Sequence, residues 1–241
     1  MTAPRFWIDE DLSVGRVIPL PQRVAHHALH VLRLRDGAAI TLFNGRGGEF
    51  SARLDAAARS ACVERFDAVE RESPLAITLV QAWLVNVKLD WVAEKVVELG
   101  AARLLLVPAA RSVAKLSGER LRSRVDHLRE VVVSACCQSG RTRIPVVEAA
   151  GSLEQGLVLA AADATAIQLV PSSQQSLLAA AGDARRIAIA VGPEGGFDDD
   201  EVALAARIGY RHAHIGPRIL RTETAGLAAI AQLQARLGDC V

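Results

Sequence analysis

The sequence predicts an α/β protein in which a small β-rich module precedes a larger domain of alternating strands and helices. Three observations support this fold class. Short runs of alternating polarity, separated by glycine turns, fill about the first 73 residues, Ser73-Pro74 marks a boundary, and strand-like and helix-like runs then alternate to the C-terminus. From these patterns alone we expect an unknotted doubly wound sheet, because true knots are almost absent among folds.

The N-terminal module has the pattern of a small β-barrel. Strands are expected over residues 38–43, 49–54 and 62–66, and a short helix over 23–33. Short strands closed by glycine turns are typical of barrels of this size. We therefore expect one domain over residues 1–73 and a second over 74–241.

The second domain opens with a strand over 77–83 and a helix over 90–99. Residues 186–191, RIAIAV, have the composition of a strand buried on both faces. After Gly192 ends this strand, Asp198 and Glu201 have the spacing of a helix capping pair, and Gly209 is suited to stop that helix. The alanine-rich run 157–166 fits a helix or a strand edge, and the pattern leaves this open.

Two glycine-bearing loops near the C-terminus predict a ligand cleft. The first is GPEGG at 192–196 and the second is GPRILRTETA at 216–225. Each follows a strand-like run and precedes a helix-like run, so both should lie side by side at the carboxyl ends of neighbouring strands. Neither loop has the spacing of a P-loop or of a dinucleotide-binding fingerprint. A single cluster of this kind would also fit a simple tight turn.

Composition indicates a protein without a membrane segment, disulfides or metal. No apolar run is long enough to span a bilayer and no signal-peptide pattern opens the chain, so we expect a cytoplasmic protein. The four cysteines form no C-x-x-C pair. His26 and His30 are four residues apart, but no acid or cysteine cluster completes a metal site, and no catalytic triad motif is present.

The charge is unevenly distributed. The chain has a net charge of +1, whereas residues 103–143 contain nine Lys or Arg against three Asp or Glu, a local net charge of +6. A basic segment of this kind is expected for a phosphate-backbone partner. A solvated helix face explains it equally well, because the arginines alternate with apolar residues at helical spacing.

Several motifs in order resemble the RsmE family of 16S ribosomal RNA uridine-N3 methyltransferases, part of the SPOUT superfamily. The C-terminal motifs are GPEGGF from 192 and RILRTETAG from 218. Upstream lie KVVELG at 95–100, RSV at 111–113, QSGR at 138–141, HALHVLRLRDG at 27–37 and LFNGRGG at 42–48. At 84–88 the chain reads LVNVK where the family usually has a Pro-Lys-Gly-Asp-like stretch, so Lys88 alone is basic there.

The resemblance implies both a fold and an activity. It implies a PUA-like β-barrel for RNA binding, followed by a SPOUT domain with a C-terminal trefoil knot. It implies a homodimeric enzyme that uses S-adenosyl-L-methionine to methylate N3 of a uridine in 16S ribosomal RNA of the small subunit. The hydrophobic residues Leu227, Ile230 and Leu233 of the last helix suit a dimer interface or a monomer core equally.

The same resemblance, with the chemistry of each position, predicts three sets of site residues. Arg221 is expected to stabilise the charge that develops when N3 loses its proton, with Glu194 and Glu223 as bases or cofactor-orienting groups; a salt bridge or a helix cap is the structural alternative for each. The expected cofactor contacts are Leu169, Val170, Pro171, Gly192, Pro193, Glu194, Gly195, Gly196, Ile215, Gly216, Ile219 and Leu220. The expected RNA contacts are Arg5, Arg33, Arg111, Arg141 and Arg143.

Two other functions remain open from the sequence. One is a related SPOUT methyltransferase that acts on another RNA such as transfer RNA. The other is a non-catalytic RNA-binding protein with a decayed site. The intact GPEGG and RILRTETAG motifs argue against decay.

Overall fold

The computed structural model describes residues 3–113 and 116–240, and it forms two compact units. The first consists of residues 1–72 together with 136–144, and the second of residues 73–135 and 145–241. This division differs from the expected boundary in one respect, because the segment 136–144 packs with the N-terminal unit. Ion pairs of Arg141 with Glu72 and of Arg143 with Glu70, and a hydrogen bond from Arg71 to the Gly140 carbonyl, hold that segment there.

The first unit is a five-stranded sheet with one short helical segment. Its strands are β1 (Arg5–Trp7), β2 (Val17–Pro19), β3 (Ala39–Phe43), β4 (Glu49–Asp55) and β5 (Ser60–Asp67), in the order β1-β3-β4-β5-β2. The helix α1 (Gln22–His26) continues directly into a π-helical turn, η1 (His27–Val31). Alternate residues of β3 and β4 face a core that includes Ile40, Leu42 and Leu54. The three predicted strands are therefore confirmed.

The second unit is an α/β layer structure built on a six-stranded sheet whose pairs are all parallel. Its strands are β6 (Ala76–Ala82), β7 (Arg103–Val107), β8 (Val146–Ala149), β9 (Thr165–Leu169), β10 (Arg186–Val191) and β11 (Arg211–Ala213). Its helices are α2 (Asn86–Glu98), α3 (Gly118–Ser139), α4 (Leu153–Ala161), α5 (Leu177–Ala181), α6 (Asp199–Ile208) and α7 (Thr222–Leu237). The predicted α/β class is confirmed.

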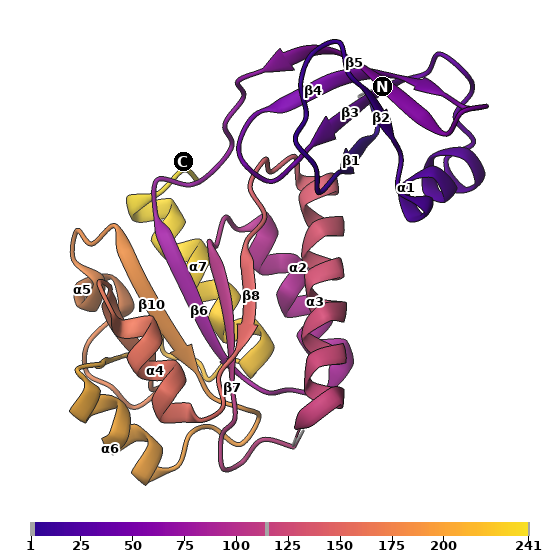
Figure 1. The fold of residues 1–241 in the computed structure, drawn as a ribbon. Coiled ribbons are helices and arrows are strands. Elements are labelled where there is room, and N and C mark those ends of the chain that lie inside the picture. The colour runs from indigo at the N-terminus through magenta and orange to yellow at the C-terminus, as the bar shows by residue number, and fades with distance from the viewer. Residues whose placement is uncertain (1–2, 114–115, 241) are drawn as a thin grey trace. The chain divides into compact units, whose positions relative to one another are not determined.

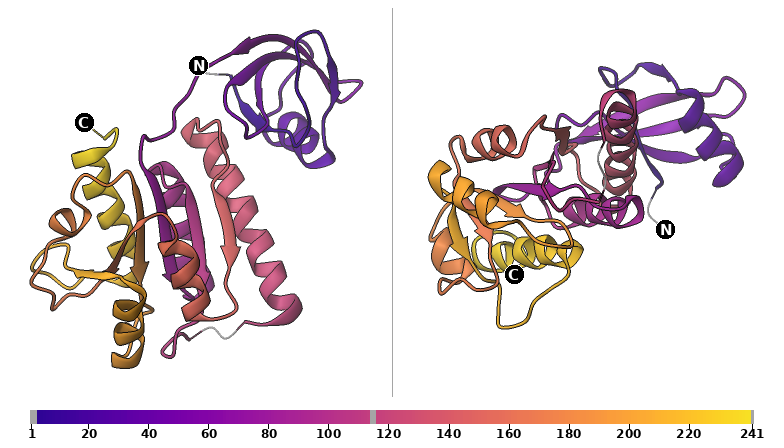
Figure 2. Two further views of the ribbon diagram at one scale, coloured as in Figure 1. Left: turned by 60° about the vertical axis from the view of Figure 1, so that its left-hand side comes forward. Right: turned by 90° about the horizontal axis from the view of Figure 1, so that it is seen from below.

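Helices cover both faces of this sheet. Figures 1 and 2 show α4 and α6 on one face and α2 with α7 on the other. The first face buries alanines of β10 and β6 against Leu153 and Leu157 of α4. On the second face Gly226 lets α7 approach closely, since a Cβ there would lie 3.0 Å from Leu79 Cδ1 of β6. The sheet is thus buried on both faces, as the continuous apolar strands predict.

Local sequence signals account for the elements next to the glycine loops. β10 covers the predicted residues, and Asp198 and Glu201 form a reciprocal capping box at the start of α6. Gly209 ends α6 in the left-handed conformation with φ of 107°. The alanine-rich run left open by its pattern contains the end of α4 and the start of β9. Within the described residues, no helix is long and apolar enough to cross a membrane.

The sheet order corrects one prediction about the cleft. The two glycine loops follow β10 and β11, which are not neighbours, because β9 lies between them. The chain therefore crosses over β9 after leaving β10 and α6. As a result the loop after β9 lies between the two glycine loops.

Candidate functional site

One cleft of about 540 Å³ lies at the carboxyl ends of β9, β10 and β11. Of the twelve residues predicted to contact a cofactor, eleven line it: Leu169, Val170, Pro171, Gly192, Pro193, Glu194, Gly196, Ile215, Gly216, Ile219 and Leu220. All three predicted catalytic residues, Arg221, Glu194 and Glu223, line it as well. The structure thus brings together three loops that are far apart in the sequence.

Glycine is required at particular points of the cleft wall. A Cβ on Gly192 would lie 2.7 Å from the backbone nitrogen of Phe197 and 3.0 Å from the backbone carbon of Gly196. Gly196 has a φ of +70°, which strains any other residue, although nothing would touch its Cβ. The first glycine therefore closes the turn, and the second permits its left-handed backbone while leaving open space beside it.

A buried hydrogen-bond network joins the two glycine loops. Gln81, at the end of β6, is fully buried and donates from Nε2 to Thr222 Oγ1 over 3.1 Å. Thr222, the first residue of α7, donates in turn to the carbonyl oxygen of Gly192. These two hydrogen bonds hold the turn after β10 against the start of α7. Neither Gln81 nor Thr222 is among the predicted site residues, because a lone Gln in a strand and a Thr at the start of a helix carry no recognisable signal of function.

Lys88 of α2 is a further residue of the cleft that the sequence analysis did not assign to it. Its Nζ lies 3.2 Å from Glu194 Oε1 and 3.3 Å from Glu223 Oε2. These carboxylates raise the pKa of Lys88 through their hydrogen bonds, that of Glu194 contributing most. The ammonium thus holds both candidate carboxylates on one wall of the cleft. The salt-bridge alternative holds for both glutamates, although they still face the cleft.

Two arginines at the mouth of the cleft have no partner within the part of the chain that the structure describes. Arg221 is the N-cap residue of α7, and its side chain makes no capping hydrogen bond. Arg218 lies three residues earlier, and both guanidiniums are exposed. Salt-bridge and cap alternatives for Arg221 find no support here. Arg218 is a second cation that the sequence analysis did not single out.

Gly195 differs from the other predicted cofactor contacts, because it does not line the cleft. A Cβ there would lie 3.2 Å from Cδ of Arg111, and the Gly195 carbonyl accepts a hydrogen bond of 2.8 Å from Arg111 Nη1. Arg111, a predicted RNA contact, therefore stabilises the back of the GPEGG turn.

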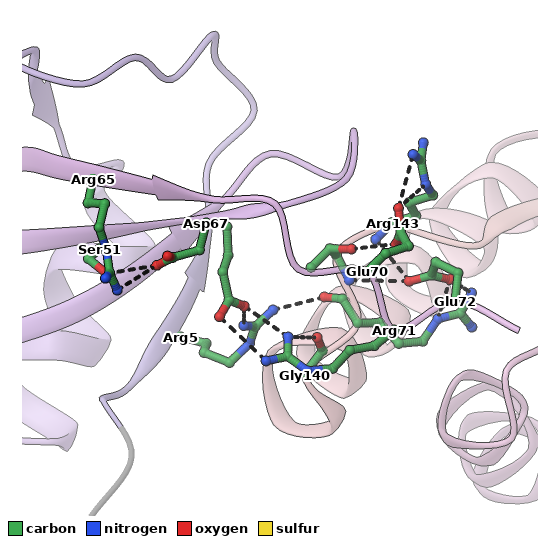
Figure 3. Close-up of polar contacts among 12 residues, drawn as sticks. Arg5, Ser51, Arg65, Asp67, Glu70, Arg71, Glu72, Gly140 and Arg143 are labelled. Carbon is green, nitrogen blue, oxygen red and sulfur yellow. Dashed lines mark hydrogen bonds and ion pairs between the residues drawn. The ribbon is translucent and has the colours of Figure 1, made fainter. Parts of the chain in front are cut away.

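Two of the predicted RNA contacts, Arg5 and Arg141, have partners within the protein. The Arg5 side chain is 10% exposed, forms an ion pair with Glu49, and donates to the Arg141 carbonyl over 2.9 Å. The Arg141 side chain is 7% exposed and donates to Glu72 Oε2, over 2.9 Å from Nε. Figure 3 shows Arg5, Glu72 and Gly140 in this set of contacts. Both arginines therefore have a structural role, and little of their surface is exposed.

Glu49 is the acid at the centre of these contacts. Burial opposes its ionisation, but hydrogen bonds from Arg71 and Arg5 outweigh that effect and lower the pKa of Glu49. Arg71 also donates to the carbonyl oxygen of Gly140 over 3.0 Å. The carboxylate therefore stays ionised and helps to hold segment 136–144 in the first unit.

Arg143 and Arg33 complete the predicted RNA set. Arg143 is exposed but lies 3.1 Å from Glu70 (Figure 3). Arg33 is exposed and follows the π-helical turn with a φ of +53°. Of the five predicted residues, only Arg33 has no polar partner among the described residues.

Most cations of the basic segment 103–143 have partners inside the protein. Six are bound in this way: Arg103, Arg111, Arg124, Arg129, Arg141 and Arg143. Arg120 and Arg122 of α3 are exposed, and Lys115 lies outside the described residues. Most of the described arginines in this segment are therefore engaged in internal contacts, which favours the structural alternative for them.

Two other predictions concern the last helix and metal. Leu227, Ile230 and Leu233 are all buried within the chain, which supports the core alternative for them. No group of three or more potential metal ligands occurs in residues 3–113 and 116–240. His26 and His30 contact each other through their rings, with centroids 5.1 Å apart.

Comparisons with known proteins identify the family. Residues 71–234 match the family described as RNA methyltransferase domain, and residues 20–64 match the RNA methyltransferase PUA domain. Ribosomal RNA small subunit methyltransferase E of Mycobacterium bovis is 32% identical over 95% of this chain and 90% of its own length. Its counterpart in Bacillus subtilis is 28% identical over 86% of each chain.

Solved structures agree with the sequence matches. Ribosomal RNA small subunit methyltransferase E of Neisseria gonorrhoeae, bound to S-adenosyl methionine, has a TM-score of 0.94 and 36% identity, and each chain is covered completely. A Legionella pneumophila protein in complex with the cofactor SAM has a TM-score of 0.94 and 30% identity over 99% of this chain and all of that one. This chain therefore belongs to the RNA methyltransferase family that includes the ribosomal RNA small subunit methyltransferases E.

Proposed function

We propose that this protein transfers a methyl group from S-adenosyl-L-methionine to N3 of a uridine in 16S ribosomal RNA. The observation that carries the proposal is the cleft, where three loops from β9, β10 and β11 meet with the residues that the family motifs supply. A protein 36% identical over its whole length is bound to the same cofactor. The relatives' names place the substrate in the small ribosomal subunit.

The residues of the cleft fit the proposed cofactor. Leu169, Val170 and Ile215 offer apolar surface for a flat purine, and the left-handed turn at Gly196 leaves the space that a side chain would fill. The carboxylates of Glu194 and Glu223 suit the positive groups of the cofactor. When bound, S-adenosyl-L-methionine supplies a methyl group on a positively charged sulfonium, which is already a strong methyl donor.

The chain must then orient the two reactants and make N3 of uridine reactive. N3 carries a weakly acidic proton between two carbonyl groups, and its removal builds negative charge on the ring. The unpartnered guanidinium of Arg221 at the mouth of the cleft is suited to stabilise that charge. Lys88 holds both glutamates in ion pairs, which favours an orienting role for them over that of a base.

Other features implied by the family remain part of the proposal. These are the trefoil knot, the homodimer, the absence of a metal and the cytoplasmic location. The crossing of the chain over β9 agrees with a knot, and the buried side of α7 leaves its exposed side for a dimer contact.

A modification map of ribosomal RNA tests the proposal. A methyl group on N3 removes a Watson–Crick donor and stops reverse transcriptase. We expect one stop in 16S ribosomal RNA to vanish when the gene is deleted and to return with the wild-type gene, but not with Arg221→Ala. A stop lost from transfer RNA would instead assign the enzyme to that substrate, and an unchanged map would contradict methylation altogether.

A further inference from the structure

A second concave site lies in the first unit, and it shares no lining residue with the cleft. It is a pocket of about 630 Å³ between the α1–η1 segment and the turn at 56–59. Its lining is Gln22, Arg23, Ala25, His26, Leu29, His30 and Arg59. It therefore offers two guanidiniums, two imidazoles and an amide, and among the described residues no carboxylate lines it.

The two imidazoles face the pocket together, whereas the neighbouring histidine does not. His26 and His30 stand one helical turn apart with ring centroids 5.1 Å apart and planes at 39°. His27 packs edge-on against Phe6, 5.8 Å away, on the core side. The π-helical turn that carries His30 is a rare form that is frequent at functional sites.

Arg59 has a left-handed backbone conformation, which is unusual for arginine. Its φ is +50°, in the left-handed region that glycine and asparagine adopt most readily. Its carbonyl accepts a hydrogen bond of 2.9 Å from Leu20, which holds the turn against the chain entering α1. Non-glycine residues in this conformation cluster at active sites and ligand-binding sites.

The acids near this turn are occupied elsewhere. Asp55 accepts a hydrogen bond from the Ala58 amide, and Asp36 accepts one from the Ala56 amide. They hold the backbone of the turn that presents Arg59 and do not line the pocket. The described lining of the pocket therefore carries guanidiniums and no carboxylate.

We propose that this pocket binds a phosphodiester of the RNA substrate, with the imidazoles against the adjoining nucleotide. Guanidinium pairs phosphate in a bidentate manner, and aromatic rings stack on unpaired bases. The exposed apolar residues Val31 and Leu32 extend the surface for a base. The proposal rests on the proposed function, and it adds an RNA contact to the predicted ones, of which Arg5 and Arg141 form internal ion pairs.

Binding of a fluorescein-labelled single-stranded RNA oligonucleotide to the full-length protein tests this proposal. Arg59→Asn removes the charge while relieving the left-handed backbone, so its melting temperature should equal or exceed that of wild type. We expect about tenfold weaker binding, and a slope of log affinity against log salt that is shallower by about one. His30→Gln should weaken binding with little effect on that slope.

Arg65→Gln is the matched control, because Arg65 is also exposed on this unit and pairs with Asp67 on β5. It changes the net charge equally and should leave RNA affinity and the salt slope unchanged. An Arg59→Asn protein with the affinity and slope of wild type would overturn the proposal. A variant that loses affinity for inorganic phosphate but not for RNA would assign the pocket to a free anion and also overturn it.

The proposed function is checked on the same proteins by calorimetry with S-adenosyl-L-methionine and by methyl transfer to 16S ribosomal RNA. If wild type transfers methyl groups while Arg59→Asn binds RNA normally, only the pocket is assigned incorrectly. If wild type transfers none, the proposed function itself fails.

Discussion

Replacing Thr222 by valine should separate the two glycine loops while preserving side-chain shape. The hydroxyl of Thr222 is buried, accepts a hydrogen bond from Gln81 and donates one to the carbonyl of Gly192. Valine keeps the volume of the side chain and removes both interactions. Gln81 Nε2 still donates to the carbonyl oxygens of Ala82 and Gly192, over 3.3 and 3.4 Å, so both groups keep one weaker partner.

The cost can be worked from these two bonds. A typical internal hydrogen bond contributes about 1 kcal/mol net, and a buried group left unsatisfied costs about 1–3 kcal/mol. Thr222→Val should therefore lower the free energy of unfolding by about 2 kcal/mol, because two bonds are lost and no group is left unsatisfied. Thr222→Ser keeps the hydroxyl and loses one methyl group, so it should cost only about 1 kcal/mol.

Urea unfolding measures the stability of both variants, and calorimetry measures their affinity for S-adenosyl-L-methionine. We expect the valine variant to bind the cofactor at least tenfold more weakly, because the turn after β10 is no longer held against α7. The serine variant should bind nearly as wild type does. If valine costs less than serine, or if both bind alike, the network does not hold the cleft together.

Three further predictions follow from single residues. Arg221→Ala should lower methyl transfer about a hundredfold while S-adenosyl-L-methionine still binds, as for loss of one oxyanion-type donor; transfer at the wild-type rate would exclude the proposed role. Glu49 has a lowered pKa, so its contribution to stability is present above its ordinary pKa of 4.5 and is lost as pH falls through the folded-state pKa. Glu49→Gln should lower the free energy of unfolding in urea at neutral pH by about 2 kcal/mol and flatten the loss of stability in acid. A stability profile in acid identical to that of wild type would contradict this. Burial raises the pKa of Cys136 to about 12. Iodoacetamide near neutral pH should therefore modify the exposed Cys62 and Cys240 and spare Cys136 until urea unfolds the protein. Alkylation of Cys136 in the folded protein, detected by mass spectrometry, would contradict this.

Elements with a strong local signal could be predicted from the sequence. The apolar run of β10 and the capping box of α6 are determined by residues close in sequence, so their positions are confirmed. The strands β1 and β2 were not predicted, because three residues are too few to show a period. The order of strands also escaped prediction, since pairing of β9 between β10 and β11 depends on contacts distant in sequence.

The candidate site could also be predicted only where the signal is local in sequence. Motif positions such as Gly192 and Pro171 line the cleft as expected. Arg141 reads as an exposed cation in the sequence, but Glu72, distant along the chain, buries it in an ion pair. Lys88 looked like the remnant of a lost motif, whereas folding brings it between Glu194 and Glu223. Charge patterns therefore overestimate RNA contacts where a distant acid neutralises the cation.

The most direct test of the central claim is the product of the purified enzyme. The protein is incubated with methyl-labelled S-adenosyl-L-methionine and either small ribosomal subunits or protein-free 16S ribosomal RNA, and the RNA is digested to nucleosides for mass spectrometry. We predict N3-methyluridine as the labelled nucleoside, from one position, and its near loss with Arg221→Ala. Label on a ribose oxygen or on another base, or no label from either substrate, would contradict the account.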